Sequence, residues 1–263
     1  MIKINEIFGP TVQGEGAAGG RHCLFVRVAD CNLTCGWCDT AYTWAFDERK
    51  AAKLEIPVSQ QLPGHDVFPK EDNFFELTPE EVFGYLQTPH LTNPRLRGNW
   101  DVKTKPTMIV ISGGEPMMQA KALEPLASML VDYDNMIHVE TAGTLIPTTT
   151  LDALVAQYNV SPKLAHSGNR LEMRRKPDVL KWFGANERAW FKYVMRDTAD
   201  FDEIDELVKI SGAPLHRVMV MPEGVTSGEN LRIAKEIVDG AVERGYGLSF
   251  RTHILLWKDV RGK

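Results

Sequence analysis

Three cysteines at short, fixed spacing are the residues of this chain best suited to chemistry. Cys31, Cys35 and Cys38 follow the pattern Cys-x3-Cys-x2-Cys. Thiolates so spaced in one loop turn toward a common point, which suits the binding of soft metals through sulfur. On a 4Fe-4S cluster, three protein ligands leave one iron open to a substrate or cofactor. The alternative is a structural zinc site, which normally takes four ligands and draws a second pair from farther along the chain.

The fourth cysteine, Cys23, does not complete a zinc site. It lies inside a predicted strand, and its neighbour His22 points to the opposite face of that strand. We therefore interpret Cys23 as a small buried apolar side chain. All four cysteines lie within residues 23–38, which is poor geometry for a disulfide framework that would hold a chain of 263 residues. Such clustering is typical of a metal site in the reducing cytoplasm.

Alternating strands and helices are predicted to position this loop. Apolar runs rich in β-branched and aromatic residues predict strands over 22–29, 107–112, 136–140, 189–195, 217–221 and 247–252. Apolar residues at helical spacing predict helices over 78–87, 120–130, 151–158, 200–210 and 229–244. The alternation favours a parallel sheet, either in a complete or partial barrel or in an open doubly wound sheet. Residues 42–77 and 89–106 break it, and we expect them to be loop insertions in a single domain spanning 1–263.

Composition and charge narrow the choice of partners. The chain is 43% hydrophobic and 25% charged, which is typical of a globular protein. Its 35 acidic and 30 basic residues give a formal net charge of -5, without a run of Lys and Arg typical of nucleic-acid binding. The sequence contains no apolar stretch near the roughly 20 residues of a membrane span, and its start does not have the form of a signal peptide. We therefore expect a cytoplasmic protein whose partners are neither nucleic acid nor membrane.

Small and polar residues follow the predicted strands at equivalent positions. The carboxyl ends of parallel strands meet at one edge of a sheet, so these residues predict one shared ligand site. The segments are residues 31–40, 112–116, 140–143, 161–163 and 221–224, followed by His253. Any one of them alone fits an ordinary turn, whereas six together indicate the mouth of a ligand cavity.

The cysteine pattern, with Trp37 before its last member, resembles the signature of the radical S-adenosylmethionine superfamily, and residues 113–116, Gly-Gly-Glu-Pro, resemble its second motif. The resemblance implies an α/β fold, a partial (βα) TIM-type barrel, in which the three cysteines hold a 4Fe-4S cluster. It implies that S-adenosylmethionine binds the open iron and is cleaved to a 5'-deoxyadenosyl radical. The cofactor contacts implied are Trp37, Asp39, Gly114, Glu115, Ser161, Lys163, Met221 and Glu223. Glycine lets the backbone approach a ligand, and Glu115 can accept hydrogen bonds from an ammonium group.

Residues 8–16, with Arg27 and the run 38–40, resemble the 7-carboxy-7-deazaguanine synthases of the queuosine-type deazapurine pathway, and the likeness covers most of the chain apart from the two insertions. It implies a carbon-nitrogen lyase that converts 6-carboxy-5,6,7,8-tetrahydropterin to 7-carboxy-7-deazaguanine with loss of ammonia. Magnesium assists, and S-adenosylmethionine is regenerated. A homodimer and an electron donor such as flavodoxin or ferredoxin are implied as well.

Substrate contacts follow from the same resemblance. The implied residues are Val12, Gln13, Gly14, Glu15, Arg27, Ser112 and His253, with Thr40 as the magnesium ligand. Amide, carboxylate and guanidinium groups suit a pterin edge and a carboxylate. Taken alone, Thr40 equally fits a turn, Lys163 a solvated loop and His253 a surface position. Two departures stand out: Ser112 replaces the commoner threonine, and the tail runs ten residues past His253, whereas in part of the family the terminal carboxylate reaches the substrate.

Two other functions stay open on the sequence. An activase that installs a glycyl radical on a partner protein shares the cysteine spacing and the Gly-Gly-Glu-Pro motif. It has no evident need for Thr40 or for the polar residues 13–16. A non-catalytic zinc-binding module would use the same cysteines without iron. The aromatic residues of insertion 42–77 suit local packing, a cover over the site or a partner contact.

Overall fold

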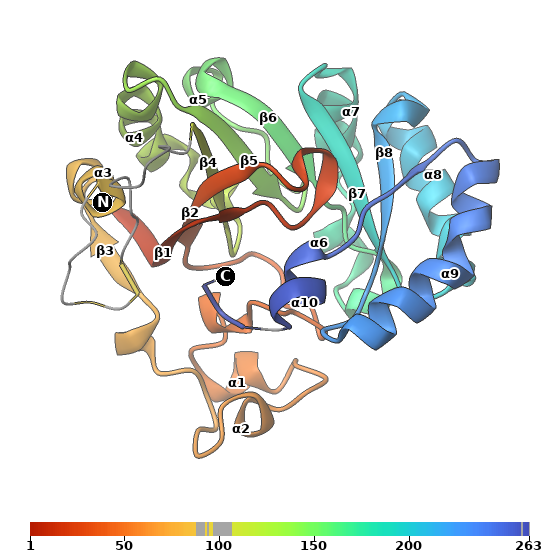
Figure 1. Ribbon diagram of the computed structural model, residues 1–263, viewed down its shortest axis with the longest axis horizontal. Helices are drawn as coiled ribbons and strands as arrows, with labels where there is room; N and C mark the ends of the chain where they lie inside the picture. The colour runs from red at the N-terminus through yellow and green to blue at the C-terminus, as the bar shows by residue number, and fades with distance from the viewer. Residues whose placement is uncertain (88–92, 94, 97–106, 259, 263) are drawn as a thin grey trace.

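The structure, a computed structural model, describes residues 1–87, 93, 95–96, 107–258 and 260–262 (Figure 1). Its strands are β1 (Ile2–Val12), β2 (His22–Val28), β3 (Phe75–Leu77), β4 (Met108–Gly113), β5 (Met136–Thr141), β6 (Val155–Val160), β7 (Ala189–Met195), β8 (Val218–Pro222) and β9 (Gly247–Leu248). They form a nine-stranded sheet in the order β3-β1-β2-β4-β5-β6-β7-β8-β9. Neighbours from β2 to β9 are parallel, whereas β1 runs antiparallel to both β2 and β3. This curved, open sheet confirms the predicted partial barrel.

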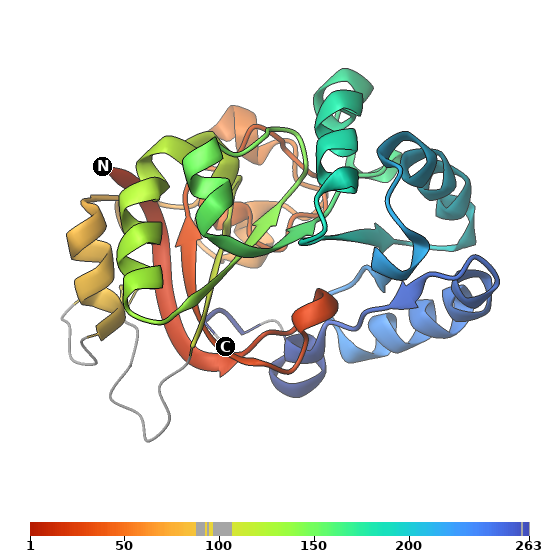
Figure 2. The same ribbon diagram turned by 90° about the horizontal axis from the view of Figure 1, so that it is seen from above.

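Helices cover the outer face of the sheet, as Figure 2 shows. Those of six residues or more before the C-terminal tail are α3 (Pro79–Gln87), α4 (Ala120–Asp132), α5 (Thr149–Leu154), α7 (Pro177–Ala185), α8 (Phe201–Ser211) and α9 (Ser227–Glu243). Short ones are α1 (Glu48–Ala51), α2 (Val58–Gln61), α6 (Leu171–Arg174) and α10 (Thr252–Trp257). Successive strand residues face opposite sides, so Ile109 and Ile111 join the helices in the main core while Ser112 faces the inside. The start of α3 is held by reciprocal hydrogen bonds between Thr78 and Glu81, as its capping-box sequence predicts.

Two predicted elements are wrong at their ends. The helix expected over 151–158 stops at Leu154, because the next six residues pair as β6 between β5 and β7 and bury Tyr158. The strand expected over 247–252 is only two residues long, and α10 begins at Thr252. His253 therefore lies in the first turn of α10, not at the end of a strand. The sequence reading also missed β1 and α7.

The loop after β1 runs to the far end of the sheet. Thr252 donates its backbone N–H to the Gly14 carbonyl at 2.8 Å, and Gly16 donates its own to Ser249 Oγ at 2.8 Å. A side chain at position 14 would meet the ring of His253, since an added Cβ would lie 2.2 Å from Nδ1. Glycine is therefore required there for the two segments to touch. The contact brings residues 13–16 beside the carboxyl ends of the last strands.

Insertion 42–77 contains α1, α2 and β3 and has a small core of its own. That core is formed by Trp44, Ala45, Ala51, Leu54, Val58 and Phe68 with Ala41, the residue just before the insertion, and Cys31 and Cys38 pack against it. Most of insertion 89–106 lies outside the described residues, as do Asp259 and Lys263 of the tail. None of the helices in the described part of the chain is both long and apolar enough to span a membrane.

Candidate active site

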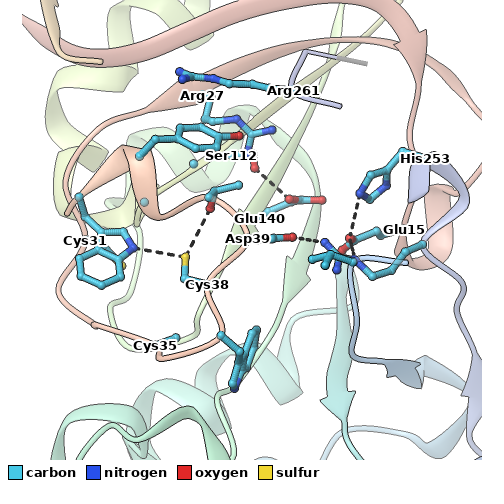
Figure 3. Close-up of a pocket in the computed structure, with 18 of the residues that line it drawn as sticks. Glu15, Arg27, Cys31, Cys35, Cys38, Asp39, Ser112, Glu140, His253 and Arg261 are labelled. Atoms are coloured by element: carbon cyan, nitrogen blue, oxygen red, sulfur yellow. Dashed lines mark hydrogen bonds and ion pairs between the residues drawn. The ribbon is translucent and has the colours of Figure 1, made fainter. Parts of the chain in front are cut away.

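The predicted ligand mouth is a cavity of about 800 Å³ at the carboxyl ends of the parallel strands. It brings together every residue proposed from the sequence except Glu115. Those lining it are Val12, Gln13, Gly14, Glu15, Arg27, Cys31, Cys35, Trp37, Cys38, Asp39, Thr40, Ser112, Gly114, Ser161, Lys163, Met221, Glu223 and His253. Figure 3 shows the three cysteines on one side of this space and Glu15, Glu140 and His253 on the other. The cavity thus has a sulfur-rich end and a polar end.

Each of the three thiols receives an N–H group. Leu33 N donates to Cys31 Sγ at 3.4 Å, Asn169 Nδ2 to Cys35 Sγ at 3.2 Å, and Trp44 Nε1 to Cys38 Sγ at 3.3 Å. Donors aimed at sulfur suit thiolate ligands and are one means of setting the potential of an iron–sulfur cluster. Burial raises the pKa of all three thiols, that of Cys35 to about 11, so a bound metal is needed to hold them as thiolates.

The three cysteines are compatible with a cluster in which each thiolate holds a different iron. Within the described residues, no three His, Cys, Asp or Glu side chains are grouped around one metal position. In a 4Fe-4S cluster each cysteine binds a different iron, so the sulfurs need not meet at one point. Cys23 is fully buried in a separate apolar cluster with Phe25 and Met108, which confirms its interpretation as a packing residue.

The two glycines of the Gly-Gly-Glu-Pro motif are needed for chain packing. A Cβ at Gly113 would lie 2.3 Å from the Val28 carbonyl oxygen, and one at Gly114 would lie 1.8 Å from that of Asp30. The motif predicts that these glycines let the backbone approach a ligand. In the structure they let it approach the backbone at the end of β2. This packing sets the cysteine loop directly against the end of β4.

Glu115 lies behind the cavity wall, fully buried. Its carboxylate accepts hydrogen bonds from Met117 N at 3.0 Å, Thr141 Oγ1 at 2.8 Å and Ala142 N at 2.8 Å. Burial raises its pKa. These contacts join the end of β4 to the end of β5, so in the structure Glu115 stabilises the edge of the cavity. Contact between its carboxylate and an ammonium group stays a prediction.

Near the sulfur-rich end, the residues expected to hold S-adenosylmethionine face each other. Lys163 Nζ donates to Ser161 Oγ at 3.0 Å and lies 5.5 Å from the centroid of Trp37, in the cavity and not on a solvated loop. Glu223 accepts from Arg196 Nε at 3.0 Å, and burial raises its pKa. Lys163 beside the Trp37 ring and the paired carboxylate of Glu223 give this part of the cavity both apolar and polar surfaces. Such a mixture suits an adenosyl group.

The polar end contains a carboxylate that the residue-by-residue sequence reading missed. Glu140, at the end of β5, accepts from Gln13 Nε2 at 3.0 Å and from Ser112 Oγ at 2.9 Å. Arg27 stands on the neighbouring wall and donates through Nε to Glu6 at 2.8 Å. The position of Glu140 could have indicated a role, because residues 140–143, which begin with it, are among the segments that the sequence predicts at the ligand site.

Glu15 lies at the centre of a buried group of charges. Its carboxylate pairs with Lys192 of β7 and with Arg251 Nε, the latter at 3.1 Å, and Arg251 also pairs with Asp39. Burial alone would raise the pKa of Glu15, but the neighbouring cations outweigh burial and lower it. His253 Nε2 is 3.9 Å from Glu15, and burial lowers the pKa of this histidine, which is therefore neutral near pH 7.

Lys192 and Arg251 were also missed from the sequence. Lys192 is the only charged residue in the otherwise apolar strand 189–195, and a charge inside a buried strand is itself a signal for a site. Arg251 stands two positions before His253. The sequence does not indicate that either residue pairs with Glu15, because Glu15 is 177 residues from Lys192 and 236 residues from Arg251 along the chain.

Thr40 follows Cys38 on the cavity wall, with its Oγ1 3.7 Å from Cys38 Sγ. The next three residues form a helical turn, yet the Thr40 side chain makes no capping hydrogen bond to it. Its carbonyl, by contrast, accepts from Thr43 Oγ1 at 2.8 Å. The hydroxyl is therefore not occupied by a capping role.

Comparison with known proteins agrees with this geometry. A 7-carboxy-7-deazaguanine synthase of Pyrobaculum aerophilum is 31% identical over 263 residues, covering 100% of this chain and 97% of that protein. The enzyme of the same name from Escherichia coli is 27% identical over 252 residues, covering 95% and 96%. The crystal structure of QueE from Escherichia coli has the same fold, with a TM-score of 0.63 at 24% identity over 96% of this chain and 94% of that one. No protein-family model matches the chain.

A curved parallel sheet with a three-cysteine loop after its first parallel strand defines the radical S-adenosylmethionine class of protein. Identity of 31% along the full chain narrows this class further. The chain belongs to the 7-carboxy-7-deazaguanine synthase family.

Proposed function

We propose that this protein converts 6-carboxy-5,6,7,8-tetrahydropterin to 7-carboxy-7-deazaguanine with loss of ammonia, as a carbon-nitrogen lyase. The observation that carries the proposal is a single cavity with three hydrogen-bonded cysteines at one end and Arg27, Gln13 and Glu140 at the other. A glycyl-radical activase needs an opening for a protein segment and has no use for this polar end. Family membership supports the same assignment.

Cys31, Cys35 and Cys38 would hold a 4Fe-4S cluster, with S-adenosylmethionine against Trp37, Lys163 and Glu223. Together these groups supply, when bound, a carbon-centred radical that removes a hydrogen atom from the substrate. Asn169 and Trp44 hold the sulfurs of Cys35 and Cys38, and the Glu115 contacts hold the ends of β4 and β5, so the cysteine loop and the rim beside it would position the reacting groups.

The polar end is suited to a pterin that carries a carboxylate. The two terminal nitrogens of Arg27 make no hydrogen bond to any other residue that the structure describes, and this planar fork matches a carboxylate. Gln13 and Glu140 place a donor and acceptors side by side for a pterin edge. Neutral His253 can give or take a proton at its ring nitrogen as nitrogen leaves the substrate.

An anaerobic assay with the carboxytetrahydropterin, S-adenosylmethionine, Mg2+ and a reductant tests the proposal. We expect formation of the carboxydeazaguanine and of ammonia, with S-adenosylmethionine regenerated. Protein that binds iron but leaves this pterin unchanged would overturn the substrate assignment. A colourless protein with stoichiometric zinc and no iron after anaerobic purification would overturn the radical assignment altogether.

Thr40 is proposed as the protein ligand to magnesium, because its hydroxyl faces the cavity beside Cys38 and is free of a capping role. Thr40→Val keeps the shape and removes the oxygen, so we expect turnover to fall at least about tenfold and to respond less to Mg2+. Thr40→Ser retains the oxygen and should behave like the parent. Magnesium titration of the turnover rate is the measurement. A valine variant with the parent's maximal rate and magnesium response would reduce Thr40 to a turn residue.

We further propose that residues 1–263 form one domain, since a single sheet runs from β1 to β9 and one large core includes residues from Ile2 to Tyr246. A homodimer, a flavodoxin or ferredoxin as electron donor and a cytoplasmic location complete the proposal. The reducing cytoplasm suits the four free cysteines.

A further inference from the structure

The end of the chain returns to the cavity and contributes an arginine to its wall. Val260, Arg261 and Gly262 all line the same space as the cysteines. Arg261 donates through Nε to Glu6 at 2.8 Å, through Nη1 to Asn73 Oδ1 at 2.8 Å and through Nη2 to Asn5 Oδ1 at 3.0 Å. Every nitrogen of its guanidinium is therefore used by the protein. These three hydrogen bonds use three of the five N–H groups of the guanidinium and hold Arg261 in place.

The carboxylate that receives Arg261 also receives Arg27. Glu6 is 3% exposed, and each of its oxygens accepts from one guanidinium, Oε1 from Arg27 Nε and Oε2 from Arg261 Nε, both at 2.8 Å. The ring of Tyr42 lies 3.8 Å from the Arg261 guanidinium carbon and 5.9 Å from that of Arg27. Burial raises the pKa of Tyr42, so the phenol is neutral. Two cations thus share one anion and one neutral ring.

Two consequences follow from this sharing. With Oε2 already occupied, Glu6 engages Arg27 through Nε alone, which leaves the two terminal nitrogens of this cavity-lining arginine unbound by Glu6. Glu6, Arg27 and Arg261 together carry one net positive charge, since Asn5 and Asn73 are neutral; Asp39 and Glu140 also act on Arg27, and Arg95 acts on Arg261. Without Arg261, Glu6 can take both nitrogens of one edge of Arg27 in a bidentate pair, and the group becomes neutral. Both changes weaken the attraction of this wall for an anion.

We propose that Arg261 is a positioning residue that fixes Arg27 through Glu6 and makes the site selective for a substrate that carries a carboxylate. This inference rests on the proposed function, in which Arg27 meets the carboxylate of the pterin. It also gives the extended tail a role: a side chain from the tail supports the carboxylate site from behind.

Arg261→Met and Arg261→Gln test the proposal in the reconstituted holoenzyme, with Arg261→Lys as the conservative variant and Lys258→Met as a control in the exposed part of the tail. We expect the two neutral variants to raise KM and Kd for the carboxytetrahydropterin about tenfold or more. We expect kcat, iron content and binding of a tetrahydropterin that lacks the carboxylate to change less than about threefold. Arg261→Lys keeps the charge and should recover part of the affinity, and Lys258→Met should match the parent.

The comparison between the two pterins separates positioning from a merely structural role. Equal losses for both ligands, or a fall in kcat with KM unchanged, would overturn the inference while leaving the proposed function intact. A parent protein that binds neither pterin would overturn the proposed function and this inference with it. Two neutral variants of different shape are used so that poor folding of one does not decide the result.

Discussion

Replacing Cys35 with alanine is expected to reduce bound iron to background and to lower turnover by about 10⁴-fold or more, the loss that follows removal of an essential group. The physical reason is that the cluster would lose one of its three protein ligands, and Asn169 Nδ2 would lose the sulfur that accepts its hydrogen bond. Iron content and the visible absorption of anaerobically reconstituted protein are the measurements. Cys31→Ala and Cys38→Ala should give the same result.

Cys23 provides a matched control in the same chain. It is fully buried among apolar side chains, and burial raises its pKa to about 12, so it stays a neutral thiol. Cys23→Ala should cost about 1 kcal/mol of folding free energy, as for the loss of a group of methyl size, and should keep iron and turnover. A Cys35→Ala variant that keeps iron and activity, or a Cys23→Ala variant that loses both, would contradict the assignment of cluster ligands.

The sulfur-rich end was predictable because its chemistry is local in the sequence. Three cysteines within a short loop, followed by strand ends rich in glycine and polar residues, identify the edge of the sheet without knowledge of any contact. The donors to the sulfurs were not predictable in this way. Trp44 comes from an insertion whose role the sequence left open, and Asn169 follows β6, most of which was predicted as the end of a helix over 151–158.

The polar end was predicted in part of its members, since Glu140, Lys192 and Arg251 were missed, and its pairing was not predicted at all. In the sequence, Glu15 is an ordinary polar residue after a glycine, and nothing beside it indicates its charged partners. Its environment depends on the loop after β1, which reaches the last strands, and β1 itself escaped prediction. The strand has mixed polarity, and Gly9 and Pro10 interrupt it where the sheet register also shifts. Periodicity therefore failed at the element that brings Glu15 to Lys192.

That pairing leads to the largest expected effect on stability. Lys192→Met removes the buried cation beside Glu15 and leaves Arg251, already shared with Asp39, as its nearest partner. Breaking a buried pair by removing one member costs about 3–5 kcal/mol, because the remaining charge is no longer compensated. We expect a loss of this size in the free energy of unfolding at neutral pH, measured by anaerobic denaturant titration. A pair on the surface, Arg232 with Glu236, is the control, and Glu236→Gln should change stability by less than about 1 kcal/mol.

The double variant Lys192→Met with Glu15→Gln decides whether uncompensated charge is the cause. It removes both charges, so most of the stability lost in Lys192→Met should return. If the double variant is as unstable as Lys192→Met alone, the loss comes from packing of the lysine side chain and the electrostatic explanation is wrong.

The pH dependence gives an independent test of the same pair. The pKa of Glu15 in the folded protein lies below its ordinary value of 4.5, so as the pH falls the unfolded chain takes up this proton first. The stabilisation from Glu15 is therefore complete well above pH 4.5 and is lost progressively below it. The parent should lose more stability than Glu15→Gln when the pH is lowered from about 7 to about 4, because glutamine has no proton to take up. Parallel stability curves for the two proteins over that range would show that Glu15 is not held as a carboxylate by Lys192 and Arg251.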